Sequence, residues 1–296
     1  MSVTPLPLPE TDTRLAAINA RLATLVPEAS AWPTQLHAAQ RHALLAPGKR
    51  FRPLLCVMVA EGCGRDDDAV LDAACVSEMV HAASLILDDL PCMDDADLRR
   101  NRPSTHVEFN ESTAILTATA LLNRAFGVLM GLKASPGIRV ELGSMLSYAV
   151  GSRGLIAGQI ADLANDDPDI ASAEVERLNG LKTGALFDFC IEAGAVLAEA
   201  SASQRSALRD FSQQIGLAFQ LLDDLKDVLL SDAQAAKSTG RDAGKATLVH
   251  LSGVPEAKRR LAGYMAQARE ALRRAEMPNS AKLDALLDAQ FRTVLG

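Results

Sequence analysis

Residues 78–106 read EMVHAASLILDDLPCMDDADLRRNRPSTH, an apolar run that ends abruptly in a group of acids. These acids include Asp88, Asp89, Asp94 and Asp95. Pro91 cannot continue a regular helix and disfavours helical geometry at the residue before it. The stretch therefore predicts a helix that ends at the first aspartate pair and a loop that folds back with the second pair. Carboxylates at a helix C-terminus face the unfavourable end of the macrodipole, so cations should neutralise them.

A second acidic group closes another apolar run, in FQLLDDLKDV at 219–228. Its carboxylates are Asp223, Asp224 and Asp227. A helix places Asp223 and Asp227 on one face, about 6 Å apart. Mg²⁺ commonly combines one or two carboxylates with substrate phosphates. Each cluster alone fits a solvated charge run equally well, but an Asp pair that closes an apolar helix twice favours two clusters holding a diphosphate through Mg²⁺.

Helical patterning extends outward from both clusters over most of the 296 residues, and no strand alternation competes with it. The predicted helices lie near 14–26, 34–45, 51–63, 69–90, 107–132, 138–164, 172–200, 203–230, 255–275 and 280–294. Hydrophobic residues make up 48% of the chain, which is ample for a large core. We predict an all-α, single-domain bundle over 14–296, preceded by a flexible N-terminal arm at 1–13.

Composition excludes several other classes. A net charge of −7 without a basic stripe argues against nucleic-acid binding. Five cysteines without a CxxC pair argue against zinc and a disulfide framework, and they favour a reduced, cytoplasmic protein with buried thiols. The N-terminus lacks the features of a signal peptide. The most apolar window, 113–132, carries Asn123 and Arg124 at its centre, so we expect a buried or subunit-facing helix instead of a membrane span.

Basic residues accompany the acids. They include Lys49, Arg50, Arg52, Arg99, Arg100, Lys182, Lys237 and Lys245. The first three lie at the start of a predicted helix, where free backbone N–H groups favour anions. For Arg50 alone we prefer an ion pair on the surface. The set as a whole suits two diphosphates, one bridged by metal and one held directly by Arg and Lys.

With these motifs the chain resembles the short-chain trans-polyprenyl diphosphate synthases, which include the farnesyl and geranylgeranyl diphosphate synthases. The similarity runs from about 40 to 250 and also includes LLAPGKRFRP, GLIAGQIADL, LKTGALF and GRDAGKATL, in the family's order. It implies the isoprenoid synthase fold, an antiparallel helical bundle around a deep central cavity, and a homodimer. Leu87 and Lys226 depart from the family's usual residues, which puts rate and metal affinity in question.

The resemblance assigns roles to individual residues. The ligands of Mg²⁺, in a set of about three ions, would be Asp88, Asp89, Asp94, Asp223, Asp224 and Asp227. The allylic diphosphate would also contact Arg99, Lys182 and Lys237. Isopentenyl diphosphate would bind to Lys49, Arg52, His81 and Arg100. Thr183 and Gln220 would line the reacting centre. Without the motif around it, His81 would fit a satisfied core histidine equally well.

The implied reaction joins isopentenyl diphosphate to dimethylallyl, geranyl or farnesyl diphosphate. Mg²⁺ and cationic side chains would stabilise the departing diphosphate. The allylic C–O bond ionises, the double bond of isopentenyl diphosphate attacks the cation, and a proton is then lost.

Product length should depend on the helix before Asp88, because one turn advances 5.4 Å, close to one isoprene unit. Related farnesyl-specific enzymes carry an aromatic residue five positions before the first Asp, where this chain has Ala83, followed by Ser84. The deeper candidates for the cavity floor are Met79, Val80, Thr117 and Leu121. We predict geranylgeranyl diphosphate as main product. A farnesyl diphosphate synthase is the alternative, and a terpene cyclase or a non-catalytic subunit is more distant.

Overall fold

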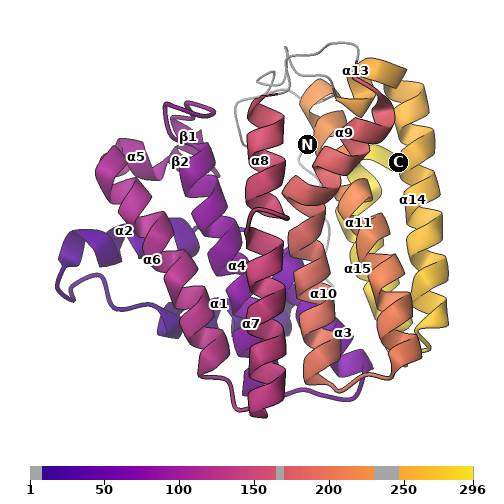
Figure 1. The fold of residues 1–296 in the computed structure, drawn as a ribbon, viewed down its shortest axis with the longest axis horizontal. Helices are drawn as coiled ribbons and strands as arrows, with labels where there is room; N and C mark the ends of the chain where they lie inside the picture. Colours follow the sequence, from indigo (N-terminus) through magenta and orange to yellow (C-terminus); the bar gives the residue numbers. More distant parts are fainter. Residues whose placement is uncertain (1–8, 165–169, 230–246, 296) are drawn as a thin grey trace.

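A computed structural model describes residues 9–164, 170–229 and 247–295 of the chain, and most of them are helical (Figure 1). This confirms the predicted all-α class. The strands among the described residues are β1 (Leu98–Arg99) and β2 (Arg102–Pro103), a small antiparallel hairpin that the sequence did not predict.

The helices follow the predicted segments closely. They are α1 (Pro9–Leu25), α2 (Thr34–Leu44), α3 (Phe51–Gly62), α4 (Asp68–Asp88), α5 (Thr105–Glu108), α6 (Glu111–Met130), α7 (Pro136–Val150), α8 (Leu155–Leu163), α9 (Ser172–Asn179), α10 (Ala185–Leu197), α11 (Ala202–Leu229), α13 (Leu248–Ser252), α14 (Val254–Arg274) and α15 (Ser280–Leu295). A π-helical turn, η1 (Gly180–Gly184), joins α9 to α10. Helix α1 begins at Pro9, within the segment predicted as the N-terminal arm. Proline is well tolerated in the first turn of a helix.

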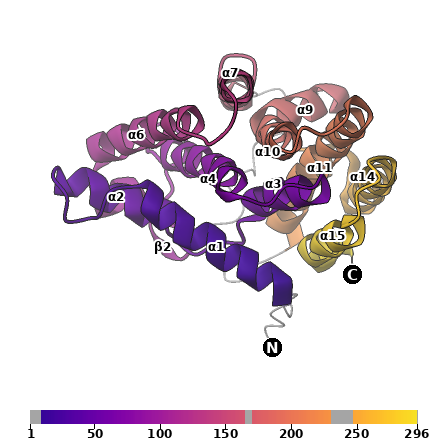
Figure 2. The same cartoon turned by 90° about the horizontal axis from the view of Figure 1, so that it is seen from below.

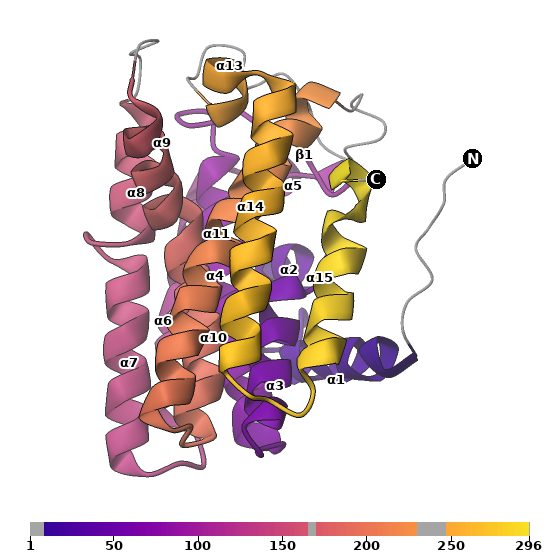
Figure 3. The same cartoon turned by 90° about the vertical axis from the view of Figure 1, so that its right-hand side faces the viewer.

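Helix α4 is at the centre of the bundle and packs against α3, α6 and α10 (Figures 1 and 2). Its N-terminus is capped by Asp67, whose carboxylate accepts hydrogen bonds from the backbone N–H groups of Ala69 and Val70. Most of its side chains are buried, and many are alanines, which allow neighbouring helices to approach closely. The upright helices α10, α11 and α14 continue the bundle, and α1 lies across one side of it, against α3 and α4 (Figure 3).

The predicted helix at 138–164 is two helices in the structure, α7 and α8, stacked end to end (Figure 3). The break falls between Gly151 and Gly154. A Cβ atom on Gly154 would lie 2.2 Å from the carbonyl oxygen of Ala149, and one on Gly151 would lie 2.6 Å from that of Ser147. The chain turns here because glycine has no Cβ atom.

Among the described residues, two helices, α4 and α6, are long and apolar enough to cross a membrane by length and composition alone. Within the protein 67% of the apolar window of α4 is buried, which is typical of a core helix, whereas the figure for α6 is 39%. Helix α6 therefore buries one face against α4 and leaves apolar side chains such as Leu116 and Met130 exposed.

Candidate active site

The first aspartate motif has the predicted backbone geometry. Helix α4 ends at Asp88, and Asp89 caps its C-terminus. The following loop folds back onto the helix end, because the N–H of Asp94 donates to the carbonyl oxygen of Asp88 (2.9 Å) and that of Ala96 donates to the carbonyl oxygen of Asp89 (3.0 Å). The loop thus brings Asp94 next to Asp88, as predicted.

The surroundings of the Asp88 carboxyl group disfavour its ionised form. Burial, helped by the neighbouring carboxylates of Asp94 and Asp89, raises its pKa to about 6 against the opposing charges of Lys182 and Arg99. At neutral pH the group is ionised in surroundings that favour its neutral form. A bound cation would relieve this cost, so the position fits a metal ligand.

Asp89 is placed differently. It is only 2% exposed, and its carboxylate accepts a hydrogen bond from Nε of Arg99 (3.0 Å) and a second, charge-assisted bond from the same guanidinium group. Burial raises the pKa of Asp89, and Arg99 opposes this shift. In the structure Asp89 pairs with Arg99, which lies on β1. The role of Asp89 as a metal ligand stays a prediction.

The second motif lies on α11, as predicted, with Asp223 and Asp227 half-buried and Asp224 buried. The hydroxyl of Thr183 donates to Oε1 of Gln220 (2.6 Å), whose amide nitrogen donates to Oδ1 of Asp224 (2.8 Å). This chain of hydrogen bonds joins η1 to α11. The two residues predicted to line the reacting centre, Thr183 and Gln220, are thus in direct contact.

Lys182 lies on the π-helical turn between the two motifs. Its ammonium group pairs with Asp162 on α8 (2.7 Å) and lies close enough to Asp88 to affect the pKa of that carboxyl. Two glycines permit this arrangement. A Cβ atom on Gly158 would lie 2.3 Å from the backbone nitrogen of Lys182, and one on Gly216 would lie 2.8 Å from Cα of Gly184.

Asp162 had no role in the sequence interpretation, although it belongs to the motif GLIAGQIADL. Gln159, one turn earlier on α8, is nearly buried, and its amide nitrogen lies 4.0 Å from the sulfur of Met93 in the loop after α4. Two polar residues three apart in an otherwise apolar helix form a polar face, and that spacing was the available signal.

A separate cationic group lies beside the aspartate motifs. The guanidinium carbon of Arg52 lies 4.5 Å from the ring centroid of Phe187 and 5.2 Å from that of Phe219. Its buried Nε atom has no hydrogen-bond partner among the described residues. Burial lowers the pKa of Arg52, and Asp223 is near enough to oppose the shift. Arg52 therefore lies where the cationic group meets the second motif.

His81 and Arg100 complete this cationic group. Burial lowers the pKa of His81 well below its usual value, and Arg52, Arg100 and Arg99 lower it further. Lys49 lies on the loop before α3, where burial lowers its pKa and its ammonium group contacts Oε1 of Gln290 on α15 (3.3 Å). Cations gathered in this way disfavour one another, and an anion would relieve the repulsion.

The Polyprenyl synthetase family model matches residues 33–282 of the chain. The chain belongs to this family. It is 43% identical over 261 residues to the geranylgeranyl diphosphate synthase of Pantoea ananas, covering 87% of this chain and 85% of that protein. It is 37% identical over 254 residues to the farnesyl diphosphate synthase of Geobacillus stearothermophilus, covering 84% and 86%.

Solved structures agree with this assignment. A geranyltransferase from Helicobacter pylori, complexed with magnesium and isoprenyl diphosphate, superposes with a TM-score of 0.88 at 29% identity, over 99% of this chain and all of that one. An FPP/GFPP synthase from Zymomonas mobilis has a TM-score of 0.83 at 33% identity, over 97% and 98%. The protein is therefore a trans-prenyltransferase with the isoprenoid synthase fold.

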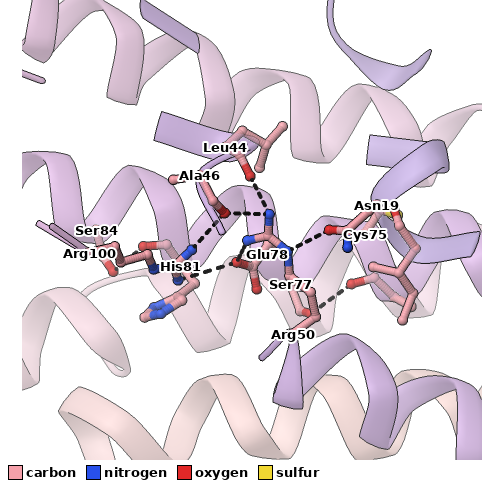
Figure 4. A network of polar contacts seen from close by, with 12 residues as sticks. Asn19, Leu44, Ala46, Arg50, Cys75, Ser77, Glu78, His81, Ser84 and Arg100 are labelled. Carbon is pink, nitrogen blue, oxygen red and sulfur yellow. Dashed lines mark hydrogen bonds and ion pairs between the residues drawn. The ribbon is translucent and has the colours of Figure 1, made fainter. Parts of the chain in front are cut away.

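The location predicted for one basic residue of this prenyltransferase, Arg50, is wrong. Arg50 was predicted to form an ion pair on the surface, but the side chain is 2% exposed and pairs with Glu78 of α4 (Figure 4). Arg50 has a left-handed backbone (φ 47°) at the N-terminus of α3. Glu78 was missed altogether, although an acid inside the apolar run of α4 was a signal for a buried cationic partner.

Two further sequence predictions concern the residues at the floor of the cavity and the two lysines Lys237 and Lys245. On α4, Ser84 is half-buried in line with His81 and Asp88, and its hydroxyl donates to the carbonyl oxygen of His81 (2.9 Å). The other floor candidates, Met79, Val80, Ala83, Thr117 and Leu121, are buried on the mutually packed helices α4 and α6. Lys237 and Lys245 lie outside the described residues.

The donor set of this prenyltransferase suits Mg²⁺. Within residues 9–164, 170–229 and 247–295, no three His, Cys, Asp or Glu side chains converge closely enough to hold a metal ion by themselves. Carboxylates supplied by two separate motifs would suit an ion that takes its remaining ligands from phosphates and water. The raised pKa of Asp88 is consistent with this arrangement.

Proposed function

We propose that the enzyme makes geranylgeranyl diphosphate by Mg²⁺-dependent head-to-tail condensation of isopentenyl diphosphate with allylic diphosphates. The observation that carries the reaction type is the pairing of two unlike regions. One is rich in carboxylates, which come from the end of α4, the loop after it and α11. The other is rich in cations, which come from α3, the loop before it and the turn after β1. The relatives named as geranylgeranyl and farnesyl diphosphate synthases support the same chemistry.

The allylic diphosphate would occupy the carboxylate region. We assign Mg²⁺ to Asp88 and Asp94 on one side and to Asp223 and Asp227 on the other, in a set of about three ions. When bound, these ions neutralise charge on the departing diphosphate. Asp89 and Asp224 support the site from behind, because each is buried and hydrogen-bonded to a neighbour.

The chain's own residues complete this region. Lys182 offers a positive charge to the leaving diphosphate, and its pairing with Asp162 fixes the position of the ammonium group. Arg99 is oriented in the same way by Asp89. The oxygen atoms of Thr183 and Gln220 present dipoles at the reacting centre that stabilise an allylic cation. No side-chain nucleophile is required.

Isopentenyl diphosphate would occupy the cationic region without metal. Arg52 and Arg100 provide planar forks suited to phosphate oxygens. Neutral His81 donates one N–H to the same diphosphate, in keeping with its lowered pKa. Lys49 adds a further positive charge from the loop before α3. Arg52, which lies close to Asp223, sets the second substrate beside the first.

The proposed product length depends on the absence of an aromatic side chain in the turn before Asp88. Ala83 and Ser84 are both small, so a fifteen-carbon chain would not be stopped there. The nearest alternative is a farnesyl diphosphate synthase, and one relative of similar identity bears that name.

The test incubates purified protein with Mg²⁺, isopentenyl diphosphate and each primer in turn: dimethylallyl, geranyl and farnesyl diphosphate. We expect a twenty-carbon diphosphate as the main product by liquid chromatography and mass spectrometry. Accumulation of the fifteen-carbon product, with farnesyl diphosphate unused as a primer, would establish the alternative. No elongation with any primer would refute the proposed function.

We further propose that the enzyme is a cytoplasmic homodimer whose subunits meet on α6 and α7. These helices lie together at one edge of the bundle (Figure 2), and between them a groove is lined by Phe126, Met130, Val140 and Tyr148. Burial of these apolar groups in a dimer would stabilise it. Light scattering should give a molar mass near twice 31.4 kDa, and a monomer mass would refute the dimer.

A further inference from the structure

We propose that Glu78 is a positioning residue for the isopentenyl diphosphate half of the site. Its buried carboxylate holds Arg100 directly and, through Arg50, fixes the loop that carries Lys49. This inference rests on the proposed function, because it concerns the affinity of the site for one of the two substrates. Glu78 lies ten residues before the first aspartate of the metal motif, and we assign it no metal ligand role.

The carboxylate of Glu78 lies between two guanidinium groups (Figure 4). Its Oε1 atom accepts a hydrogen bond from Arg50 (2.5 Å) and lies 3.5 Å from a terminal nitrogen of Arg100. The side chains of Glu78 and Arg50 are 4% and 2% exposed. A pair buried this deeply is stable only when its remaining polar atoms are also satisfied.

Arg50 satisfies this condition by binding the loop. One terminal nitrogen donates to the carbonyl oxygens of Leu44 (3.1 Å) and Ala46 (2.8 Å), and Nε donates to Oδ1 of Asn19 on α1 (2.9 Å). These contacts tie the end of α2 and the start of the loop to α4. The role of Arg50 is therefore structural, since its nitrogens are engaged within the protein.

Arg100 meets the same loop from the other side. Its guanidinium group donates to the carbonyl oxygen of Ala46 at 3.4 Å. A Cβ atom on Gly48 would lie only 2.8 Å from this guanidinium, so the backbone of the loop is in direct contact with Arg100. The positions of the loop and of Arg100 thus depend on each other, and Glu78 joins the two arginines.

The contact lengths separate the roles of the two arginines. Arg50 makes contacts of 2.5 to 3.1 Å, whereas those of Arg100 to Glu78 and Ala46 are 3.5 and 3.4 Å. Arg100 is oriented by weak contacts and keeps its capacity for strong bonds to phosphate oxygens. The charge of Glu78 is needed for this orientation, even though it partly offsets the positive field of the site.

The decisive variant is Glu78→Gln, which keeps the shape of the side chain and removes its charge. We expect the KM for isopentenyl diphosphate to rise about tenfold, while kcat and the KM for the allylic substrate change less than about twofold. A matched control is Glu61→Gln, which removes the half-buried ion pair with Arg14 far from the site and should leave all three constants unchanged. An unchanged or lower KM for isopentenyl diphosphate in Glu78→Gln would overturn the proposal. So would an equal loss in all three constants.

A second variant guards against misfolding. In Glu78→Leu with Arg50→Met, both charges of the buried pair are replaced by apolar groups, which avoids leaving one of them unpaired. We expect it to stay folded, with a lower unfolding temperature because Leu44 and Ala46 lose a donor, and to show the same selective rise in KM. A folded double variant with wild-type KM values would overturn the proposal.

Binding of inorganic pyrophosphate without Mg²⁺, measured by calorimetry, provides a readout that does not need turnover. We expect weaker binding in both Glu78 variants than in the wild type and in Glu61→Gln, and equal binding would overturn the proposal. Failure of the wild type to elongate any primer would instead refute the proposed function. The two failures are therefore distinguishable.

Discussion

The two halves of the active site have opposite electrostatic problems. Around Asp88, buried carboxylates gather and burial raises the pKa of this group to about 6. Around His81, buried cations gather and the pKa of the imidazole is lowered well below its usual value. Each half is incomplete without a ligand, but the missing charge is positive in the first and negative in the second. Under the proposed function, this difference would let the enzyme distinguish two diphosphates by whether metal accompanies them.

Each half also contains a buried carboxylate that orients a cationic side chain of the site. Buried Asp89 holds Arg99 in the first half, and buried Glu78 holds Arg100 in the second. In both cases a carboxylate behind the site orients a guanidinium group at its surface. The halves differ in the charge that they offer to a ligand. In both of them a buried carboxylate orients an arginine side chain.

The largest effect is expected from removing one carboxylate from each of the two motifs that we assign to Mg²⁺. In Asp88→Asn with Asp223→Asn, activity should fall by about 10⁴-fold or more, because two groups that stabilise the leaving diphosphate are lost. A coupled pyrophosphate-release assay would measure this. Asp210→Asn, also on α11 but paired with Arg274 on the surface, is the control and should retain full activity. Elongation that survives in the double variant would contradict the assignment of the metal-binding half.

The second half should respond in a different kinetic constant. Arg100→Gln removes a guanidinium group that we assign to isopentenyl diphosphate, so the KM for that substrate should rise about 100-fold with little change in the KM for the allylic primer. Steady-state kinetics with each substrate varied in turn would show this. Equal changes in both KM values would mean that the halves are not independent.

A smaller change should alter the product without stopping the reaction. Ala83→Tyr introduces an aromatic group five positions before Asp88 and should shorten the main product from twenty to fifteen carbons, with total turnover reduced less than about tenfold. Ser84→Tyr tests the adjacent position, which is half-buried where Ala83 is fully buried. Chromatography of the products would compare the two variants. If only Ser84→Tyr shortens the product, the floor lies on the line of His81 and Asp88.

The sequence predicted features that depend on neighbouring residues. Pro91 set the end of α4, and the spacing of Asp223 and Asp227 placed them on one face of α11. It did not predict contacts between distant segments. Arg50 and Glu78 are 28 residues apart, and Lys49 and Gln290 are 241 apart. No local pattern gives the partner of a buried charge, so Arg50 was assigned to the surface.

Backbone irregularities were missed for a related reason. The break between α7 and α8 and the π-helical turn at Gly180–Gly184 interrupt segments whose apolar spacing is continuous. The turn depends on the approach of α8 and α11, which Gly158 and Gly216 allow. Glycines within a helical pattern therefore marked close contacts here, and the sequence alone did not tell which helix would make them.

The smallest expected effect is on the free energy of unfolding. It tests whether ionised Asp88 destabilises the protein when no metal is bound. The pKa of Asp88 is about 6 in the folded protein and near 3.8 in the unfolded chain, so the folded state binds this proton more tightly. The wild type should therefore lose about 1 to 3 kcal/mol of unfolding free energy at this site as the pH rises from 4 to above 6.

Asp88→Asn lacks this titration, and the variant should become more stable than the wild type by that amount at pH 8 while remaining similar at pH 4. Urea unfolding in the presence of a chelator would measure the difference at each pH. Adding Mg²⁺ with pyrophosphate at pH 8 should reverse the order, because the metal complex stabilises the wild type more than Asp88→Asn. A stability difference that does not change with pH would mean that Asp88 is well solvated. The contrast between the two halves would then rest on the cationic half alone.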